Sequence, residues 1–448
     1  MATIPSAPVI GTPVPGADAV VAWLQELASP ELTDAERIDR LRVLEELKGR
    51  SCAVQARLAV DLDQSQRAVH AAAGLPAAQQ GRGVAAQLGL ARRESPHRAA
   101  SLLGLGKVLI GEMPYAYDAL AGGRLSEFRA TLLARETACL SLEDRREVDR
   151  VLCADPDRFE GWGDQRFAAE ARRLAQRLDP HACAKRASRA EAERHVSLRP
   201  APDTMSRLSA LLPVAQGISV WATLSRLADS LIAAGDGRSR GQIMADTLVE
   251  RVTGQTTADT VAVAVNLTIS DETLFNGGYE PAWVQGHGPI PAQTARQLVA
   301  TALAKAHTTL RRLYTTPSTG QLVAMDSPSR WFPDSLGLFI DLRDQTCRTP
   351  WCDAPVRHHD HPQPWRAGGE TTGPNSQGLC EQCNYAKEAP GWRARPTNGP
   401  PDQPHTIEIT TPTGHQHHTT APPQPPPTRP RPTPHRLDIG FRKLTLAA

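Results

Sequence analysis

The chain of 448 residues carries 50 lysine and arginine side chains against 48 aspartate and glutamate side chains, which gives a formal net charge of +2 at pH 7. A chain of this length exceeds one ordinary hydrophobic core, so we expect about two folded units with flexible ends. The balance of charge excludes binding to nucleic acid by bulk attraction, and any such contact must come from a local arrangement of residues.

The start of the chain and its cysteine content argue against a secreted, a membrane-spanning and a disulfide-rich protein. The sequence has no run of about eighteen apolar residues, and its start lacks the basic and apolar regions of a signal peptide. We therefore expect a cytoplasmic protein without a membrane partner. Eight cysteines are too few for a disulfide scaffold in so long a chain. Four of them lack a pairing motif and are interpreted as small buried apolar residues: Cys52, Cys139, Cys153 and Cys183.

Helix signals begin after a proline- and glycine-rich opening. Thr33 and Glu36 can satisfy each other's free backbone amides in a capping box, and apolar residues follow at helical spacing. Ser141 stands in the same relation to a second helix, for which Pro156 supplies a stop. Residues 30–255 are accordingly predicted to be mostly helical.

The pattern changes to short strands in the middle of the chain. The β-branched run at 261–268 and the glycine- and proline-punctuated segment at 278–291 predict a short strand pair. A helix is expected over 292–314 and another short strand over 320–327. From 397 the composition turns to proline, threonine and histidine, which cannot bury enough apolar surface to order itself.

The tail over 397–448 is therefore expected to be largely disordered. Within it, the segment HTIEITTPTGHQHH at 405–418 could form one small hairpin, and RLDIGFRKLTLAA at 436–448 could add a terminal strand elsewhere.

Two cysteine pairs form a frame upstream of this tail. Cys347-x4-Cys352 and Cys380-x2-Cys383 have the spacing of two knuckles that converge on one tetrahedral ion. Four thiolates fill the coordination sphere of Zn²⁺ and leave no open position, so this ion should be structural. Any catalysis must then use the residues between the pairs.

The residues between and just after the cysteine pairs follow the order D-H-x13-N-x8-N, formed by Asp360, His361, Asn375 and Asn384. This order, interleaved with the cysteine frame, resembles the HNH nucleases of the ββα-metal type over roughly 340–395. Pro362 departs from the branched aliphatic residue expected after the Asp-His pair.

The rest of the chain is similar to an actinobacterial group that joins such a module to an N-terminal helical domain of unknown function, including the repeat-element-encoded proteins of mycobacteria. The stretches that carry this similarity are PYAYDALAGGRLSEFRA, GHGPIPAQTARQL, LRDQTCRTPWC and GLCEQCNYAKEAPGW. We therefore predict an α+β chain with four parts: a flexible N-terminus (1–29), a mainly helical domain with a small β element (30–335), a zinc-stabilised ββα-metal HNH module (336–396) and the tail (397–448).

The chemistry of phosphodiester hydrolysis fits these residues. Asp360 and the side-chain carbonyl of Asn384 are hard oxygen donors suited to a catalytic Mg²⁺ or Mn²⁺. His361 is substantially neutral near pH 7 and can remove the proton of the attacking water. The resemblance implies DNA as substrate and a role for Asn375 as a loop clamp that turns His361 inward. Two basic side chains are candidates for phosphate contacts: Arg366 and Lys387.

Several alternatives remain open. His358 or His359 could be the base in a shifted register, although a shift breaks the spacing to Asn375. Asp360 and Asn384 could instead be a turn residue and a helix cap. Trp365 and Trp392 are interpreted as packing residues. The alternative function is a zinc-stabilised module that binds nucleic acid without catalysis.

Overall fold

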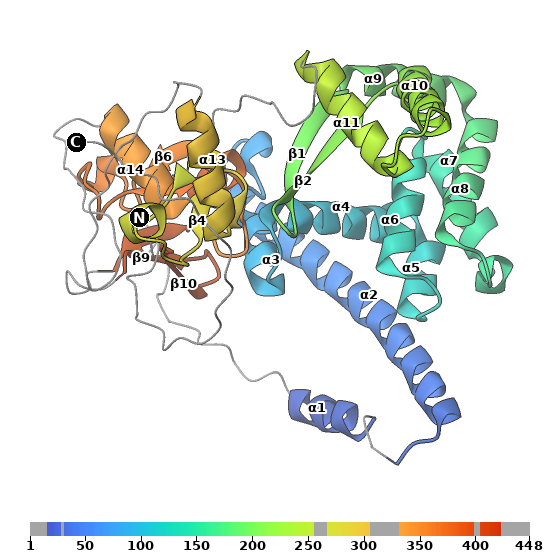
Figure 1. Ribbon diagram of the computed structural model, residues 1–448. Helices are drawn as coiled ribbons and strands as arrows, with labels where there is room; N and C mark the ends of the chain where they lie inside the picture. The colour runs from blue at the N-terminus through green and yellow to red at the C-terminus, as the bar shows by residue number, and fades with distance from the viewer. Residues whose placement is uncertain (1–15, 28–30, 255–266, 305–330, 398–403, 423–448) are drawn as a thin grey trace, which may run out of the picture.

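The computed structural model describes residues 16–27, 31–254, 267–304, 331–397 and 404–422, and most of its secondary structure is helical (Figure 1). The first part of the chain contains the helices α1 (Ala17–Glu26), α2 (Asp34–Ala72), α3 (Val84–Arg92), α4 (Pro96–Glu112), α5 (Pro114–Ala121), α6 (Glu127–Glu136), α7 (Leu142–Cys153), α8 (Asp164–Leu178), α9 (Pro180–Ala192), α10 (Val214–Ala233) and α11 (Arg240–Thr253). Among the described helices, none is long and apolar enough to cross a bilayer.

The predicted helix starts are confirmed. The Oγ1 of Thr33 accepts a hydrogen bond from the amide of Glu36, whose carboxylate accepts from the amide of Thr33 at 2.8 Å. Ser141 caps α7 by accepting from the amide of Asp144 at 3.1 Å. The expectation that residues 1–29 are flexible throughout is wrong, because this segment contains α1. The sequence of α1 is apolar and free of glycine and proline, which favours a helix.

The main hydrophobic core lies among α2 and α4–α8. Fully buried side chains from several of these helices meet there, including Leu109, Leu120, Leu133 and Phe167. Phe159 packs edge-on against Phe167 with ring centroids 5.4 Å apart. Alanine and aliphatic side chains thus form much of the interface between these helices.

A β-hairpin, which the sequence analysis did not predict, lies within the region expected to be mostly helical. The strands β1 (His195–Ala201) and β2 (Met205–Leu211) pair antiparallel, with Leu198 opposite Leu208. Asp203 and Thr204 lie in the turn with φ of 59° and 58°, the left-handed conformation that primed hairpin turns require. The alternation of apolar and polar residues in HVSLRPA and MSRLSAL was the sequence signal for these strands.

The small β element is confirmed in its described part. β3 (Leu267–Thr268), β4 (Ala282–Val284) and β5 (Gly288–Ile290) form an antiparallel sheet, in which β4 is central. A short helix, α12 (Asp271–Phe275), joins the first two strands, and α13 (Ala292–Ala304) follows the sheet. The rest of the predicted strand at 261–268, the end of the predicted helix at 292–314 and the predicted strand at 320–327 lie outside the described residues.

We call residues 331–397 and 404–422 the C-terminal module. Its elements are α14 (Asp334–Asp344), β6 (His358–Asp360), β7 (Gln377–Leu379), α15 (Glu381–Lys387), β8 (Arg393–Pro396), β9 (Thr406–Thr410) and β10 (Gln416–Thr420). Strands β6 and β7 pair antiparallel, and α15 follows β7 directly. Strands β8, β9 and β10 form a second antiparallel sheet.

This second sheet corrects the predicted boundary of the tail. The segment that starts at 397 was expected to be largely disordered, yet its hairpin, which the sequence allowed, continues the sheet of β8. Ile407 and Ile409 are buried, because alternate residues of TIEIT face the module. The buried Arg348 guanidinium donates to the carbonyl oxygens of Thr419 at 2.6 Å and His405 at 3.2 Å. The expected terminal strand at 436–448 lies outside the described residues.

The C-terminal module also contacts the helical part of the chain. Trp392 packs against Gly83, the residue that precedes α3, where any side chain would collide with the indole ring. The φ of Gly83 is 86°, so both backbone and space require glycine. The hydroxyl of Thr413 donates to the side chain of Gln87 at 3.1 Å, and α15 contacts α4. Trp392 is thus a packing residue, as predicted.

Two truncations test the correction of the tail. A chain that ends at Thr397 loses β9 and β10, and with them two buried isoleucines worth ~1.5–3 kcal/mol each. We expect its C-terminal module to melt at a lower temperature than that of the full chain. A chain that ends at Pro422 keeps both strands and serves as the matched control. Identical melting curves for the two truncated chains, followed by circular dichroism, would contradict the correction.

Candidate functional site

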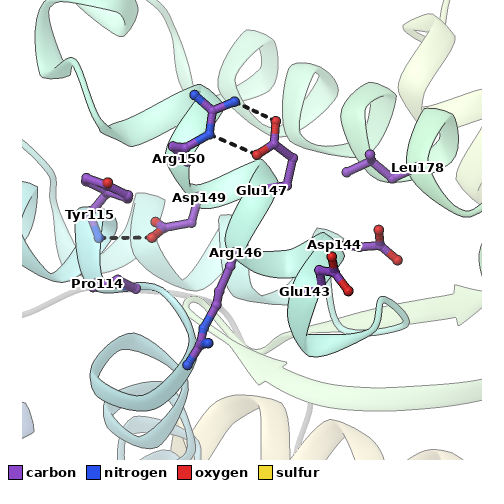
Figure 2. Close-up of a pocket in the computed structure, with 9 residues that line it drawn as sticks. All are labelled: Pro114, Tyr115, Glu143, Asp144, Arg146, Glu147, Asp149, Arg150 and Leu178. Atoms are coloured by element: carbon purple, nitrogen blue, oxygen red, sulfur yellow. Dashed lines mark hydrogen bonds and ion pairs between the residues drawn. The ribbon is translucent and has the colours of Figure 1, made fainter.

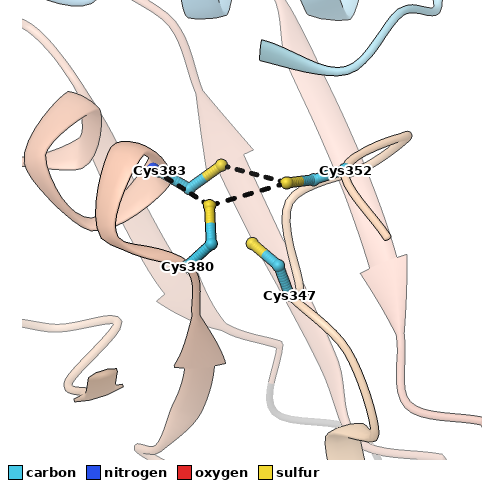
Figure 3. A group of neighbouring side chains, drawn as sticks. All are labelled: Cys347, Cys352, Cys380 and Cys383. Carbon is cyan, nitrogen blue, oxygen red and sulfur yellow. Dashed lines mark hydrogen bonds between the residues drawn. The ribbon is translucent and has the colours of Figure 1, made fainter. Parts of the chain in front are cut away.

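Four cysteines converge in the C-terminal module (Figure 3). Cys347 and Cys352 lie in the loop after α14, Cys380 is the N-cap of α15, and Cys383 lies in its first turn. Their sulfur atoms all lie within 4.8 Å of one another, and Cys352 Sγ is 3.6 Å from Cys380 Sγ and 3.5 Å from Cys383 Sγ. A tetrahedral Zn²⁺ with Zn–S bonds of ~2.3 Å requires sulfur atoms ~3.8 Å apart. The four cysteines could therefore bind zinc.

The electrostatics of the cluster also favour a cation. Three of the thiols are buried and Cys380 is half-buried, so charges on the sulfur atoms are not screened by water. Hydrogen bonds within the cluster raise the pKa of Cys352 and of Cys383 and lower the pKa of Cys347 and of Cys380, so the four thiols do not titrate independently. Four thiolates at this spacing repel one another unless a dication lies between them.

Strand β6 directs its side chains alternately toward two helices. His358 faces α15, with its ring 6.1 Å from the ring of Tyr385, and Asp360 faces the same helix. His359 points to the other side, where its Nε2 lies 2.9 Å from a carboxylate oxygen of Asp341 in α14. His359 is exposed despite this contact, whereas His358 is half-buried. This orientation also argues against His359 as the base of a shifted register.

Asp360 is held through one of its two carboxylate oxygens. Its Oδ2 accepts from Gln377 Nε2 at 2.8 Å and lies 3.0 Å from Lys387 Nζ. Burial raises the pKa of this carboxyl group, and the charge of Lys387 opposes the shift. Within the described part of the chain, Oδ1 has no hydrogen-bond partner. One oxygen is thereby left to receive a ligand while the other fixes the group.

His361 directly follows β6 and lies among aromatic rings. Its Nε2 is 2.9 Å from the hydroxyl oxygen of the buried Thr371. The ring centroid of Phe332 is 4.5 Å away and that of Trp365 6.1 Å away. The hydrogen bond to Thr371 and the contacts with these rings help to orient the imidazole, and Trp365 packs against it while remaining 40 % exposed.

Asn375 makes the loop clamp that the sequence led us to expect. Its Oδ1 accepts from the amide of Gln363 at 3.0 Å, and its Nδ2 donates to the carbonyls of Gln363 at 3.1 Å and Glu370 at 2.8 Å. These three bonds tie the two ends of the loop that follows His361. A side chain of this length with both a donor and an acceptor is needed to bond both strands of the loop.

The two basic candidates have different environments. Lys387 is largely buried, and its ammonium group contacts Asp360, the carbonyl of His361 at 2.8 Å and Glu388 at 3.3 Å. These contacts use its three N–H donors, so a phosphate contact by Lys387, which stays a prediction, would require it to give up one of them. Arg366 remains exposed, with its guanidinium 3.3 Å from a carboxylate oxygen of Glu388.

Asn384 lies on α15 in the turn after Cys380, and its backbone amide donates to the carbonyl of Cys380 at 3.0 Å. In the described residues its side-chain amide has no hydrogen-bond partner. Since α15 contacts β6, Asn384 lies on the helix that faces Asp360. The alternative of Asn384 as a helix cap is contradicted, because Cys380 is the cap.

Sequence reasoning missed Gln377 and Thr371 as supporting groups, and it named Lys387 as a phosphate contact without its role beside Asp360. Gln377 and Lys387 hold Asp360, and Thr371 holds His361. The only sequence signal for them was their position between or just after the cysteine pairs, which does not distinguish them from solvent-exposed polar residues.

A pocket of about 430 Å³ lies in the helical part of the chain, away from the cysteine cluster (Figure 2). Asp149 at its wall accepts from the amides of Tyr115 at 2.9 Å and Ala116 at 2.8 Å, at the start of α5. Burial raises the pKa of Asp149 to about 6. Glu147 and Arg150 form an ion pair at 2.7 Å. The carboxylate of Asp149 therefore caps the start of α5, and its raised pKa is explained by this buried structural role.

Comparison with known proteins places the helical part in a family. The model of the domain of unknown function DUF222 matches residues 38–328, which is more than half of the chain, and the chain belongs to this family. The predicted N-terminal domain of unknown function is thereby confirmed. Searches of curated proteins and of solved structures gave no match. The cysteine cluster and Asp360 lie beyond the matched residues.

The cysteine cluster leads to a measurable prediction. Protein washed free of loosely bound metal should carry about one Zn²⁺ per chain by elemental analysis, because four converging thiols favour this ion. Cys380→Ser should lose the zinc and the order of the C-terminal module, while Cys52→Ser, outside the cluster, should keep both. Wild-type protein without zinc would refute the assignment.

Proposed function

We propose that the chain is a metal-dependent endonuclease of the HNH type, which hydrolyses phosphodiester bonds in DNA. The observation that carries the proposal is the position of Asp360 and His361 at the end of a strand that packs on α15, the helix bearing Asn384. The cysteine cluster anchors this helix, and Asn375 closes the intervening loop. A strand pair followed by a helix is the arrangement that the resemblance implied.

The residues present fit a hard divalent cation. Asp360 Oδ1 and the side-chain oxygen of Asn384 have no partner in the described structure, and Mg²⁺ and Mn²⁺ prefer oxygen ligands. Such an ion, when bound, would polarise the scissile phosphate and stabilise the departing oxygen. Gln377 and Lys387 orient Asp360, so the carboxylate does not need to rearrange to receive a ligand.

His361 is the proposed general base. Its ring is oriented by Thr371 and by the face of Phe332, and a neutral imidazole can take the proton of an attacking water. Asn375 would act indirectly, because its side chain bonds, among the described residues, to backbone groups of the loop after His361. Arg366 is exposed at the rim beside Glu388 and is a candidate to contact a phosphate there.

The charge balance of the site has a consequence for metal binding. Asp360 is paired with Lys387, and Arg366 is paired with Glu388, so these groups together carry no net charge. A dication gains little Coulomb energy from such a site by itself. A phosphodiester adds negative charge, and we therefore expect metal and DNA to bind cooperatively.

The ion pair between Asp360 and Lys387 supports a second candidate function, which is binding of nucleic acid without cleavage. In that case Lys387 would be the permanent counter-ion of Asp360, and no divalent ion would compete for the carboxylate. DNA cleavage and metal affinity separate the two candidates.

The first test is cleavage. Wild-type protein should nick or linearise plasmid DNA in millimolar Mg²⁺ or Mn²⁺ and lose the activity in EDTA. His361→Ala should lower the rate by about 10²–10⁴-fold, the usual contribution of a general base, with zinc content unchanged. His359→Ala, which removes the neighbouring imidazole on the opposite face of the strand, should retain most of the activity. Equal losses in both variants, or cleavage unaffected by EDTA, would contradict the proposal.

The second test is metal affinity without DNA. Lys387→Met removes the charge beside Asp360 and keeps an apolar stem, so binding of Mn²⁺ in calorimetry should tighten by about tenfold or more. Arg366→Met removes a charge that is exposed and screened by water, and it should change the affinity little. Undetectable Mn²⁺ binding in all three proteins would favour the non-catalytic candidate.

A further inference from the structure

Cys139 and Cys183 face each other in the helical part of the chain. Their sulfur atoms are 3.5 Å apart, and both residues are half-buried. The sequence separates them by 44 positions and offers no motif that joins them. The interpretation of these two as isolated buried residues is therefore incomplete, because tertiary packing makes them a pair.

The two cysteines belong to elements that are otherwise weakly joined. Cys139 lies in the connection between α6 and α7, and Cys183 lies in the first turn of α9. None of the side chains of α9 is fully buried. Besides the thiol pair, Arg186 of α9 donates to the carbonyl of Arg135 at the end of α6. Helix α9 thus lies on the surface with few apolar contacts to hold it.

We propose that Cys139 and Cys183 are an oxidative modification site, at which a peroxide closes a reversible disulfide that fastens α9 to the α6–α7 connection. The observation that carries this inference is the facing pair of accessible thiols. It is independent of the proposed nuclease activity.

The reaction balances with hydrogen peroxide as the oxidant. The thiolate of Cys139 attacks one peroxide oxygen, so that an S–O bond forms, the O–O bond breaks, and the leaving hydroxide takes up a proton as water. Cys183 Sγ then attacks the sulfenic sulfur, an S–S bond forms, the S–O bond breaks, and a second water leaves with the proton of Cys183. Two thiols are oxidised, and the peroxide is reduced by two electrons.

The geometry allows the second step, and the burial of Cys183 favours one order of attack. Bond formation requires the sulfur atoms to approach from 3.5 Å to ~2.05 Å, which a surface helix without fully buried side chains can accommodate. Burial raises the pKa of Cys183 to about 11, so this thiol is the poorer first nucleophile. Cys183 therefore acts as the resolving thiol.

The other two cysteines of the helical part are not placed to form a disulfide, so oxidation should link Cys139 and Cys183 selectively. Cys153 is buried, and its burial raises the pKa of its thiol far above the usual range. Cys52 is half-buried, but within the described residues no second thiol contacts it. Neither can form an intramolecular disulfide in the folded chain as described.

The test uses the full, zinc-loaded chain. Increasing hydrogen peroxide should produce one linked peptide pair that contains Cys139 and Cys183, with a loss of about 2 Da for the two hydrogens, and dithiothreitol should reverse it. The melting temperature of the helical part should rise by roughly 5–10 °C, because the bond closes a long loop in the unfolded chain.

Matched variants separate this inference from general oxidation. Cys183→Ser should abolish the linked peptide and the rise in melting temperature, while Cys52→Ser should preserve both. As a measurement that needs no variant, dibromobimane should bridge the reduced pair in the native wild-type protein and become fluorescent. Separate sulfinic acids at the two positions, linkage to other cysteines, or no bridging by dibromobimane would overturn the proposal.

Discussion

The C-terminal module depends on one buried carboxylate. Asp344 is fully enclosed at the end of α14, and its two oxygens accept from Arg343 at 2.7 and 3.0 Å and from the amide of Gly378 at 2.7 Å. Arg348 approaches the same carboxylate at 3.5 Å and extends to the β9–β10 hairpin. The remaining donors of Arg343 bind carbonyls in the loop before β7. A single buried charge thereby joins α14, the cysteine loop, β7 and the second sheet, and removing one partner of such a buried pair costs ~3–5 kcal/mol.

On this support lies the cysteine cluster, which could bind zinc, and we propose that Asp360 and Asn384 form a second set of ligands with different chemistry. The four thiols are soft, rigidly arranged and mostly buried, which suits a permanent structural ion. Asp360 and Asn384 supply hard oxygens, and the neighbouring Lys387 keeps the local charge near zero. The cysteine cluster can hold a metal in the absence of DNA, whereas the proposed site at Asp360 and Asn384 would bind a metal tightly only when a phosphate is present. This difference in metal affinity follows from charge. Four neighbouring thiolates repel one another without a bound cation, whereas the charge of Asp360 is already balanced by Lys387.

Short sequence patterns correctly predicted those features that depend on residues close together in the chain, such as helix starts. The capping residues Thr33 and Ser141 start their helices because a side-chain oxygen satisfies amides within three residues. The pairing of cysteines also depends on short, regular spacings, whereas the clamp by Asn375 was implied by the family resemblance. The β1–β2 hairpin was missed because the helical signals around it were stronger than its alternation. The β9–β10 hairpin was placed in a disordered tail because composition describes the average of a segment, whereas its buried isoleucines occupy only alternate positions.

By itself the sequence determined the helical class of the first part, the convergence of four cysteines and the order of the polar residues between and beside them. Each of these follows from residue types at short separations, where the geometry of a helix, a strand or a knuckle is known in advance. The tertiary structure alone decided that Lys387 pairs with Asp360, that His359 faces α14, and that Cys139 meets Cys183. These contacts join residues on different elements, and their distances depend on how those elements pack, because no local spacing restricts which surface side chains come together.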